Sequence, residues 1–345
     1  MAITIKDIAQ QLNISPATVS LALNGRPGVN AQTRENVLEL VKELNYTGHV
    51  GADKLSKKKQ GKNLGTIGFL VYKRYAKIIT DSQFFTALIS AVEGAAKTRN
   101  YTMLLTYCIG ENEIVESLRL LKNSNLSGLL VLGTELSEED AATFYHSNLP
   151  TVILDCDILG CELDTVTIHN KDGIFRAMKY LHELGHKQIG YLRSSFSIRN
   201  FAQRFFGYER CLEYFGLEQD KQKIFMLEPT LEGSCADVLE LLKSGITFPP
   251  AIIADNDLIA LGAMKAFSQR GIRIPDDVSI IGFDDIPMAS FIEPQLTSIR
   301  VPCDDFGEVA VEQLLSRQEN PHAITKKISV STELKIRSSA ISKTI

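Results

Sequence analysis

Apolar residues near the start of the chain recur at the spacing of a short amphipathic helix. In TIKDIAQQLNIS, residues 4–15, four of them fall at i, i+3, i+4 and i+7 and share one helical face: Ile5, Ile8, Ala9 and Leu12. Thr4 and Asp7 supply the side chains of a capping box at its start. We expect this helix to break at Asn13.

Two further helices are predicted within the first 47 residues. In SPATVSLALNG, Ser15 is a natural N-cap, Pro16 suits the first helical position and Gly25 is placed to end the helix. The segment NAQTRENVLELVKELNY begins with the N-cap Asn30 and turns four apolar residues inward: Val37, Leu40, Val41 and Leu44. Three short helices with a tight turn between the first two predict a helix-turn-helix unit.

Beyond a Gly- and Lys-rich stretch, the pattern changes to apolar runs that alternate with amphipathic helices. The runs are GTIGFLVY, YTMLLTYC, SGLLVLG, LPTVILDC, KQIGYLRS, KIFMLEP, PAIIADN and VSIIGFDD. Near-continuous apolar strands separated by helices indicate parallel sheets covered on both faces. Eight strand–helix units are too many for one compact sheet of this type. We therefore divide the core into two subdomains near Asp157. The predicted fold is a small all-α head and an α/β core of two doubly wound parallel-sheet subdomains, with a ligand cleft between them.

Composition and cysteine usage point to an ordinary globular protein. Of 345 residues, 44% are hydrophobic and 23% are charged. The first residues, MAITIKDIAQ, lack the apolar core of a signal peptide, and no stretch is apolar enough to span a bilayer. The six cysteines are scattered without a C-x-x-C pair, which is typical of reduced thiols. We expect a cytoplasmic protein with no membrane partner.

The net charge of -4 is unevenly distributed along the chain. Up to residue 62 there are nine Lys and Arg against five Asp and Glu, whereas the remainder holds 28 against 36. A basic head on an acidic body suggests that the head contacts a polyanion, although lysine-rich termini also serve solubility alone.

The stretch HELGH, residues 182–186, matches the H-E-x-x-H pattern of zinc metalloproteases. That motif needs both histidines on one face of a continuous helix. Here the helical pattern ends at Gly185, so we expect His186 to start the next segment and to point away from His182. We interpret the match as a helix end; a zinc hydrolase built on His182, Glu183 and His186 is the alternative.

Other catalytic patterns are weak. The chain has no G-x-S-x-G elbow, no P-loop and no G-x-G-x-x-G after its first predicted core strand. Asp284 and Asp285 could perform acid–base chemistry, but helix-capping or ligand-binding acids are commoner at strand ends. We therefore predict no enzyme activity, no cofactor and no metal site.

The second helix has the features of a DNA recognition helix, whose first residues contact base edges in the major groove. Val19 and Leu23 are expected to face the core of the head. The residues expected to face the groove are Pro16, Ala17 and Leu21, and those expected near phosphates are Ser15, Thr18, Ser20 and Asn24. The alternative is that these helices form only a small packing unit.

These residues carry a resemblance to a known family. The segment from TIKDIAQQLNISPATVSLALNG to TRENVLELVKELNY resembles the DNA-binding head of the lactose-repressor/galactose-repressor (LacI/GalR) family of bacterial regulators. Later blocks are similar to family blocks in order and spacing: FFTALISAVEGAA, YLHELGHKQIGYL, RFFGYERCL, DNDLIALGAMKAF and GIRIPDDVSIIGFDDIPMASFIEPQLTSI. The resemblance covers nearly the whole chain.

The resemblance implies a hinge helix after the head, a core like that of periplasmic sugar-binding proteins, and a dimer that reads a near-palindromic operator in double-stranded DNA. It places Leu55 where the family inserts a leucine into the minor groove, a wedge that kinks the duplex. The hinge residues expected to contact DNA are His49, Ala52, Lys54 and Leu55, and the capping residue Thr4 is expected to contact it in the head. The chain departs from the family at Gly48 and His49, where Pro-Asn is usual, and at Leu21, where many members have a polar residue. Operator preference is therefore not carried over.

The expected effector site follows from the ends of the predicted strands, because ligands of open α/β sheets bind beyond the carboxyl ends of the strands. Asp155, Asn256 and Asp284 stand at such ends, and Arg204 lies in the helix after QIGYLR. The resemblance implies that all four contact the effector, and that Phe84 stacks on it as an aromatic ring does in some members. These groups suit the hydroxyls of a sugar. The alternatives are that Asp257 or Asp284 caps a helix and that Phe84 belongs to the core.

The expected domains are a head over 1–47, a hinge and linker over 48–62, an N-terminal core subdomain over 63–158 and 290–320, and a C-terminal core subdomain over 159–289 and 321–345. The ending ISKTI is too short for the leucine-heptad helix that makes some members tetramers, so we expect a homodimer. We predict a repressor switched by a small-molecule effector, with a carbohydrate as the expected ligand. The alternatives are a sugar-binding transport component and, within the family, a regulator with a protein corepressor, which Arg204 and Asp284 disfavour.

Overall fold

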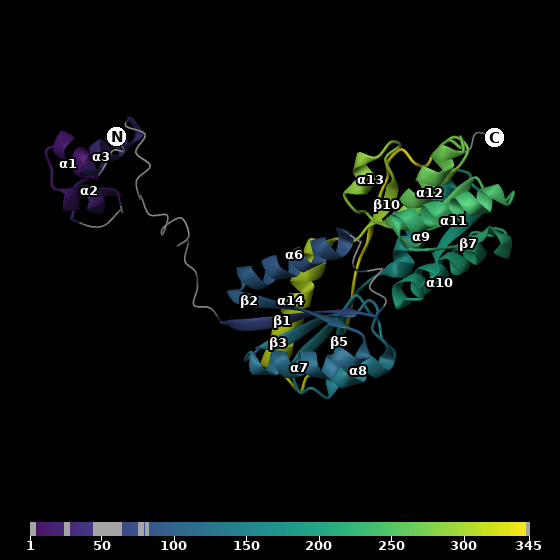
Figure 1. Ribbon diagram of the computed structural model, residues 1–345, viewed down its shortest axis with the longest axis horizontal. Helices are drawn as coiled ribbons and strands as arrows, with labels where there is room; N and C mark the ends of the chain where they lie inside the picture. Colours follow the sequence, from purple (N-terminus) through teal and green to yellow (C-terminus); the bar gives the residue numbers. More distant parts are fainter. Residues whose placement is uncertain (1–4, 24–27, 44–63, 75–78, 80–82, 343–345) are drawn as a thin grey trace. The chain divides into compact units, whose positions relative to one another are not determined.

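The chain divides into two compact units between Lys62 and Asn63, which we call the head and the core. The structure is a computed structural model that describes residues 5–23, 28–43, 64–74, 79 and 83–342. Figure 1 shows the head as a small helical unit and the core as two lobes of sheet and helix.

The head consists of three short helices packed on one small apolar cluster. They are α1 (Ile5–Gln11), α2 (Pro16–Leu23) and α3 (Ala31–Glu43). The buried residues of the cluster are Ile8, Ala9, Val19, Ala22 and Val37. Ile8, Ala9, Val19 and Val37 were expected inside, whereas Ala22 was not, and the side chain of Leu23 lies outside the described residues.

Local side-chain chemistry sets where these helices begin. The Thr18 N–H donates to the Ser15 hydroxyl at 3.0 Å, and the Thr33 N–H donates to the side-chain oxygen of Asn30 at 2.7 Å. Asn13 takes a φ of 53° between α1 and α2, a conformation that asparagine tolerates better than most residues. The predicted caps and break are confirmed, whereas Thr4, Gly25 and Leu44 lie outside the described residues.

The core contains two six-stranded sheets. Sheet A has the order β11-β5-β4-β3-β1-β2 and is parallel throughout; sheet B has the order β12-β10-β9-β8-β6-β7 and is parallel except for β12. The strands of sheet A are β1 (Gly65–Lys73), β2 (Tyr101–Ile109), β3 (Gly128–Leu132), β4 (Thr151–Leu154), β5 (Asp164–Ile168) and β11 (Lys327–Val330). Those of sheet B are β6 (Ile189–Ser194), β7 (Ile224–Leu227), β8 (Ala251–Ala254), β9 (Ser279–Asp284), β10 (Thr297–Arg300) and β12 (Glu333–Lys335).

Helices cover both sheets. The helices are α6 (Gln83–Thr98), α7 (Ile114–Asn123), α8 (Glu138–Tyr145), α9 (Asn170–Glu183), α10 (Arg199–Tyr214), α11 (Leu231–Lys243), α12 (Asp257–Gln269), α13 (Met288–Phe291) and α14 (Cys303–Glu319), with 3-10 turns at Glu111–Glu113 and Lys221–Lys223. In Figure 1, α6, α7, α8 and α14 lie with sheet A, and α9 to α13 lie with sheet B. Within the described ranges, no helix is long and apolar enough to cross a membrane.

The alternation of side chains along β1 explains the two layers around sheet A. Phe69 and Val71 join the apolar cluster that includes residues of α6 and α14. Leu70 and Tyr72, one residue out of phase, join the cluster that includes residues of α7 and α8. Because successive strand residues point to opposite faces, an almost uninterrupted apolar run is what a sheet covered on both sides requires.

The structure places three segments in a different subdomain from the one predicted from the sequence. Residues 159–168 were assigned to the C-terminal subdomain, but β5 pairs with β4 in sheet A. Residues 290–300 were assigned to the N-terminal subdomain, but β10 pairs with β9 in sheet B. The strand β11 was assigned to the C-terminal subdomain, but it pairs with β5 in sheet A. The chain therefore crosses between the sheets after β5, after β10 and between β11 and β12.

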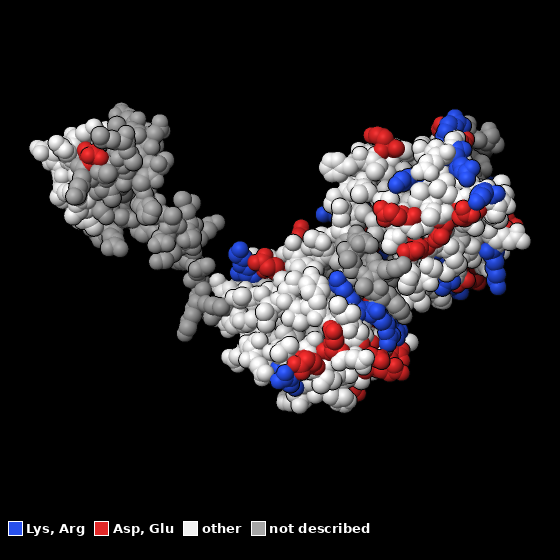
Figure 2. All heavy atoms as spheres, in the orientation of Figure 1, with Lys and Arg blue, Asp and Glu red and all other residues white. Residues whose placement is uncertain are grey.

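Charged side chains of both signs share the surface of the core, and Figure 2 shows acidic residues beside basic ones on the C-terminal lobe. The ion pair between Asp164 and Arg317 is buried instead. Asp164 accepts hydrogen bonds from Arg317 Nε at 2.7 Å and Nη2 at 2.9 Å, from Gln313 at 2.9 Å and from the Lys326 N–H at 2.7 Å. Burial opposes ionisation of Asp164, but these donors outweigh it and hold its pKa below the ordinary value.

Replacing Arg317 with methionine is expected to lower the free energy of unfolding by about 3 kcal/mol or more, because it leaves the Asp164 carboxylate buried without its cation. Urea unfolding at pH 7 measures the loss. Arg119→Met is the matched control, since Arg119 forms an exposed pair with Glu116 on α7, and its curve should overlay the wild type. Equal midpoints for the two variants would show that the buried pair stabilises nothing.

Candidate functional site

The residues predicted to bind an effector lie at the carboxyl ends of strands from both sheets. Asp155 follows β4 of sheet A, whereas Asn256 follows β8 and Asp284 ends β9 of sheet B. Arg204 comes from the second turn of α10, and Phe84 from the start of α6. All five line one narrow cavity, which we call the cleft cavity. Its other lining residues are Phe85, Thr134, Ile198, Asn200 and Phe201.

Arg204 is the central cation of the cleft cavity and is only 3% exposed. Its Nε donates to the side-chain oxygen of Asn170 at 2.8 Å, and its Nη1 donates to the backbone oxygen of Asp255 at 2.5 Å. Its Nη2 lies 3.4 Å from Asp284 Oδ1, and the guanidinium stacks 3.6 Å from the centre of the Phe283 ring. These contacts fix the plane of the guanidinium.

Asp155 connects the two subdomains. Its carboxylate accepts hydrogen bonds from the Thr134 hydroxyl at 2.6 Å and from the Asn200 amide at 2.8 Å, and the same amide reaches the Asp155 backbone oxygen at 3.1 Å. Because Asp155 follows a strand of sheet A and Asn200 lies in α10 beside sheet B, this contact spans the cleft. A ligand that competes for Asp155 changes what holds the two subdomains together.

Thr134 and Asn200 were missed by the sequence analysis. Both stand just beyond strand ends, Thr134 after β3 and Asn200 in the first turn of the helix that follows β6. The strand-end rule that selected Asp155 could have selected them too. Their pairing with Asp155 could not be foreseen, because it depends on how the two sheets face each other.

Both aspartates of the cleft cavity have unusual backbone conformations. The φ angles are 59° for Asp155 and 109° for Asp284, a region that residues with a side chain rarely adopt. Such conformations cost on the order of 1–3 kcal/mol each and persist where the surroundings hold them, often at binding sites.

Burial favours the protonated forms of the carboxyl groups around Arg204. Burial raises the pKa of Asp284 to about 7, although the charge of Arg204 opposes the shift. Burial also raises the pKa values of Asp155 and Asp255 to about 6, against the hydrogen bonds that each accepts. Carboxyls that can donate or accept a hydrogen bond, beside a fixed guanidinium, suit a ligand rich in hydroxyl groups.

Asn256 and Phe84 each have a structural role as well. The Asn256 side-chain oxygen caps α12 by accepting the Ile259 N–H at 3.0 Å. Phe84 is buried in the apolar core and packs edge-on against Phe85, with ring centres 5.0 Å apart. Both residues also line the cleft cavity, so the structural and the ligand-binding interpretations are compatible.

Asp257 is a structural acid. It is fully buried and accepts hydrogen bonds from the Ser298 hydroxyl at 2.6 Å and from the Ile286 N–H at 2.8 Å. These bonds fix the loop after Asp284 to the neighbouring strand.

The histidines of HELGH make separate contacts. The helix α9 ends at Glu183, and Gly185 takes a φ of 88°, as a C-terminal glycine does. The ring of His182 stacks on Phe215 at 4.8 Å, whereas His186 Nε2 lies 3.0 Å from the backbone oxygen of Ile341. The prediction of a helix end is confirmed.

In the head, α2 presents the residues expected at DNA only in part. Ser15, Pro16 and Ala17 are exposed, whereas Thr18 and Leu21 are half-buried. Ser20 lies in α2, but its side chain is outside the described residues, as are Asn24, Thr4 and the hinge residues His49, Ala52, Lys54 and Leu55. Small exposed side chains at the start of a capped helix allow close approach to base edges.

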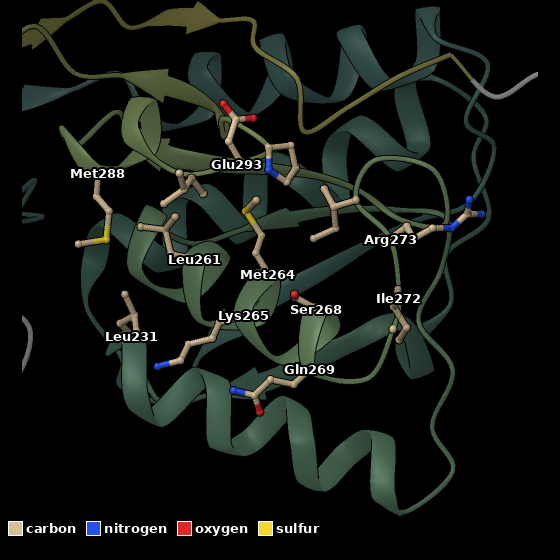
Figure 3. Close-up of a pocket in the computed structure, with 14 residues that line it drawn as sticks. Leu231, Leu261, Met264, Lys265, Ser268, Gln269, Ile272, Arg273, Met288 and Glu293 are labelled. Carbon is tan, nitrogen blue, oxygen red and sulfur yellow. The ribbon is translucent and has the colours of Figure 1, made fainter.

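A larger hollow, about 590 Å³, lies in the C-terminal subdomain away from the cleft cavity. In Figure 3, Leu261 and Met264 of α12 and Met288 of α13 point into it. Eight of its fourteen lining residues are apolar, so it matches a polar effector less well than the cleft cavity does.

Comparisons with known proteins agree with this arrangement. Residues 4–48 match the family model described as bacterial regulatory proteins, lacI family, and residues 178–340 match a periplasmic binding protein-like domain. The chain is 31% identical to the ribose operon repressor of Haemophilus influenzae over 320 residues, which cover 92% of this chain and 93% of that protein.

Solved structures show the same fold over nearly the full length. A complex of the transcriptional regulator CelR with cellobiose superposes with a TM-score of 0.72 at 24% identity, covering 98% of this chain and 99% of that one. The lac repressor dimer bound to operator and the anti-inducer ONPF gives a TM-score of 0.70 at 23% identity, covering 99% and 100%. The chain belongs to the LacI family of bacterial regulatory proteins, which are DNA-binding transcriptional repressors and not enzymes.

Proposed function

We propose that this repressor acts as a cytoplasmic homodimer whose affinity for a near-palindromic operator is switched by a sugar bound in the cleft cavity. The observation that carries the proposal is the convergence of Asp155, Arg204, Asn256 and Asp284 on one cavity lined from both subdomains. A ligand there contacts both subdomains at once, and so favours one relative orientation of them.

Sugar is the ligand class that this lining suits best. Carboxyls, amides and one fixed guanidinium provide both acceptors and donors for hydroxyl groups, and Phe84 and Phe201 provide apolar surface for the face of a ring. The fold neighbour CelR was solved with cellobiose, which is consistent with a carbohydrate.

A second copy of the chain is the proposed partner of the exposed apolar surface. β2 forms an edge of sheet A, and its alternate residues Leu105, Tyr107 and Ile109 are 36%, 50% and 59% exposed. Phe291 of α13 is 85% exposed. Exposed apolar edges of this kind are unfavourable unless covered. The lac repressor of similar fold was solved as a dimer.

The switch is a shift between two states. In one state the paired heads match the half-sites of the operator, and in the other they do not. The effector changes operator affinity only by the difference in its own affinity for the two states. Induction and corepression both follow this logic, according to which state binds the ligand more tightly.

Replacing Ala17 with glutamate is expected to weaken DNA binding by about 100-fold, because it places a carboxylate against the groove and the phosphates. Fluorescence anisotropy with a labelled fragment of the promoter of the protein's own gene measures the loss of affinity. The stoichiometry of the protein–DNA complex should be two chains per operator site. The matched control is Leu38→Glu, a residue of α3 that is 44% exposed. If both variants lost the same DNA-binding affinity, α2 would not be the recognition helix.

A further inference from the structure

A second cavity adjoins the cleft cavity, and we call it the outer cavity. It has a volume of about 350 Å³. Four of its lining residues come from the N-terminal subdomain, Arg74, Thr134, Glu135 and Leu136, and four from the C-terminal subdomain, Ser197, Ile198, Arg199 and Ala202. Thr134 and Ile198 line both cavities, so the two spaces are neighbours. A ligand larger than one sugar ring would extend from the cleft cavity into the outer cavity.

The guanidinium of Arg74 lines the outer cavity and forms no hydrogen bond with its nearest carboxylates. The Arg74 side chain is only 33% exposed, yet its nearest carboxylates, Glu111 and Asp140, both lie 3.7 Å away, beyond hydrogen-bond distance. Among the residues that the structure describes, no acceptor takes a hydrogen bond from this guanidinium. N–H donors of this guanidinium therefore remain for a ligand.

Arg199 adds a second guanidinium from the opposite subdomain. Its Nη2 donates to Glu138 of α8 at 2.7 Å, an ion pair that spans the cleft and occupies only part of the fork. The carboxylate that lines the same cavity, Glu135, accepts the backbone N–H of Arg74 and so is committed to the protein. The lining thus carries two guanidinium groups and one carboxylate, and three further carboxylates, those of Glu111, Asp140 and Glu138, lie within 3.7 Å of the two arginines.

The guanidinium of the cleft cavity is already engaged by the protein. Asp155 and Asp284 face this cavity with a single guanidinium, Arg204, whose three edges already contact Asn170, Asp255 and Asp284. An anionic group is therefore better placed in the outer cavity, where two arginines from opposite subdomains keep N–H donors that bind phosphate and carboxylate well.

Building on the proposed function, we propose that the effector is a sugar that carries an anionic group, with the ring in the cleft cavity and the anion between Arg74 and Arg199. Phosphate and carboxylate share the chemistry that these arginines recognise. Because the two arginines belong to different subdomains, the anion also joins the subdomains directly. A neutral sugar would lack that link.

Isothermal titration of the full-length protein with matched pairs of ligands tests this assignment. Each pair joins a neutral sugar with its charged derivative: glucose with glucose 6-phosphate, ribose with ribose 5-phosphate, and galactose with galacturonate. The anionic member is expected to bind at least about tenfold more tightly than its neutral partner. Comparing the titrations of the sugar phosphates with that of galacturonate shows whether the site prefers a phosphate or a carboxylate. A neutral sugar that binds as tightly as its anionic derivative, or more tightly, would overturn the proposal.

Single-residue variants distinguish the contribution of the outer cavity to ligand binding from that of the cleft cavity. Arg74→Gln is expected to abolish the preference for the anionic member while the neutral partner keeps its affinity. Glu138→Gln frees Arg199 and is expected to increase the preference, whereas Arg119→Gln, on the exposed face of α7, is expected to leave it unchanged. An anionic preference that survives Arg74→Gln would overturn the outer site. Sugar binding that does not depend on Arg204 would overturn the proposed function instead.

Discussion

Replacing Arg204 with alanine is expected to weaken effector binding by about 100-fold, since a hydrogen bond to a charged group contributes about 1.5–3 kcal/mol and the guanidinium also orients the carboxyls of the cleft cavity. The guanidinium is buried, stacks on Phe283 and donates to Asn170, Asp255 and Asp284. Without it, the carboxyls of the cleft cavity face one another with no cation. They then take up protons at higher pH than in the wild type, and the hydrogen-bonding pattern offered to a sugar changes.

Titration of a sugar that binds the wild type measures this loss, and urea unfolding reports separately whether the variant folds. Arg204→Lys keeps the charge but not the planar fork, so it should retain stability better than it retains affinity. If Arg204→Ala binds the sugar as the wild type does, the ligand does not occupy the cleft cavity.

Raising the pH from 4 to 7 is expected to destabilise the core through Asp284. Its pKa is about 7 in the folded chain against 3.8 in the absence of burial, so across this range the folded state holds a proton that the unfolded state has lost. The free energy of unfolding therefore falls as the pH rises, by up to ~1.4 kcal/mol per pH unit for this carboxyl, and levels off above pH 7.

Asp284→Asn removes this titration. The difference in urea midpoint between pH 5 and pH 7.5 should be smaller in the variant than in the wild type, by an amount equivalent to about 2–3 kcal/mol. Asp155 and Asp255, whose pKa values burial raises to about 6, are present in both proteins, so the comparison isolates the Asp284 carboxyl together with its coulombic coupling to them. An unchanged midpoint difference would mean that Asp284 is not held in its protonated form by burial.

Local features of the fold were predictable from the sequence because short-range chemistry determines them. Ser15 and Asn30 cap helices through the N–H groups three residues ahead, so the evidence for each lies within one turn of the chain. The residues of the cleft cavity were predictable for a related reason. The carboxyl ends of parallel strands meet at one edge of a sheet, and Asp155, Asn256 and Asp284 occupy such ends.

Long-range features were not predictable. The assignment of β5, β10 and β11 to the wrong subdomains arose because their partners are chosen by the crossings of the chain between sheets, which leave no local pattern. The contact between Asn200 and Asp155 likewise joins residues 45 positions apart on different sheets. Sequence periodicity reports which face of an element is buried, and it does not report against which neighbour.

Operator binding with and without the effector is the most direct test of the switch. The measurement is fluorescence anisotropy of the purified protein with fragments of its own promoter and with random duplex, across a range of salt concentrations. If the head contacts both phosphates and bases, the protein binds one promoter fragment more tightly than random duplex, and salt weakens this binding. Adding the sugar that binds the cleft cavity changes the affinity for that fragment by about 5–150-fold. Equal affinity for promoter and random duplex at every salt concentration, with or without the sugar, would contradict both expectations.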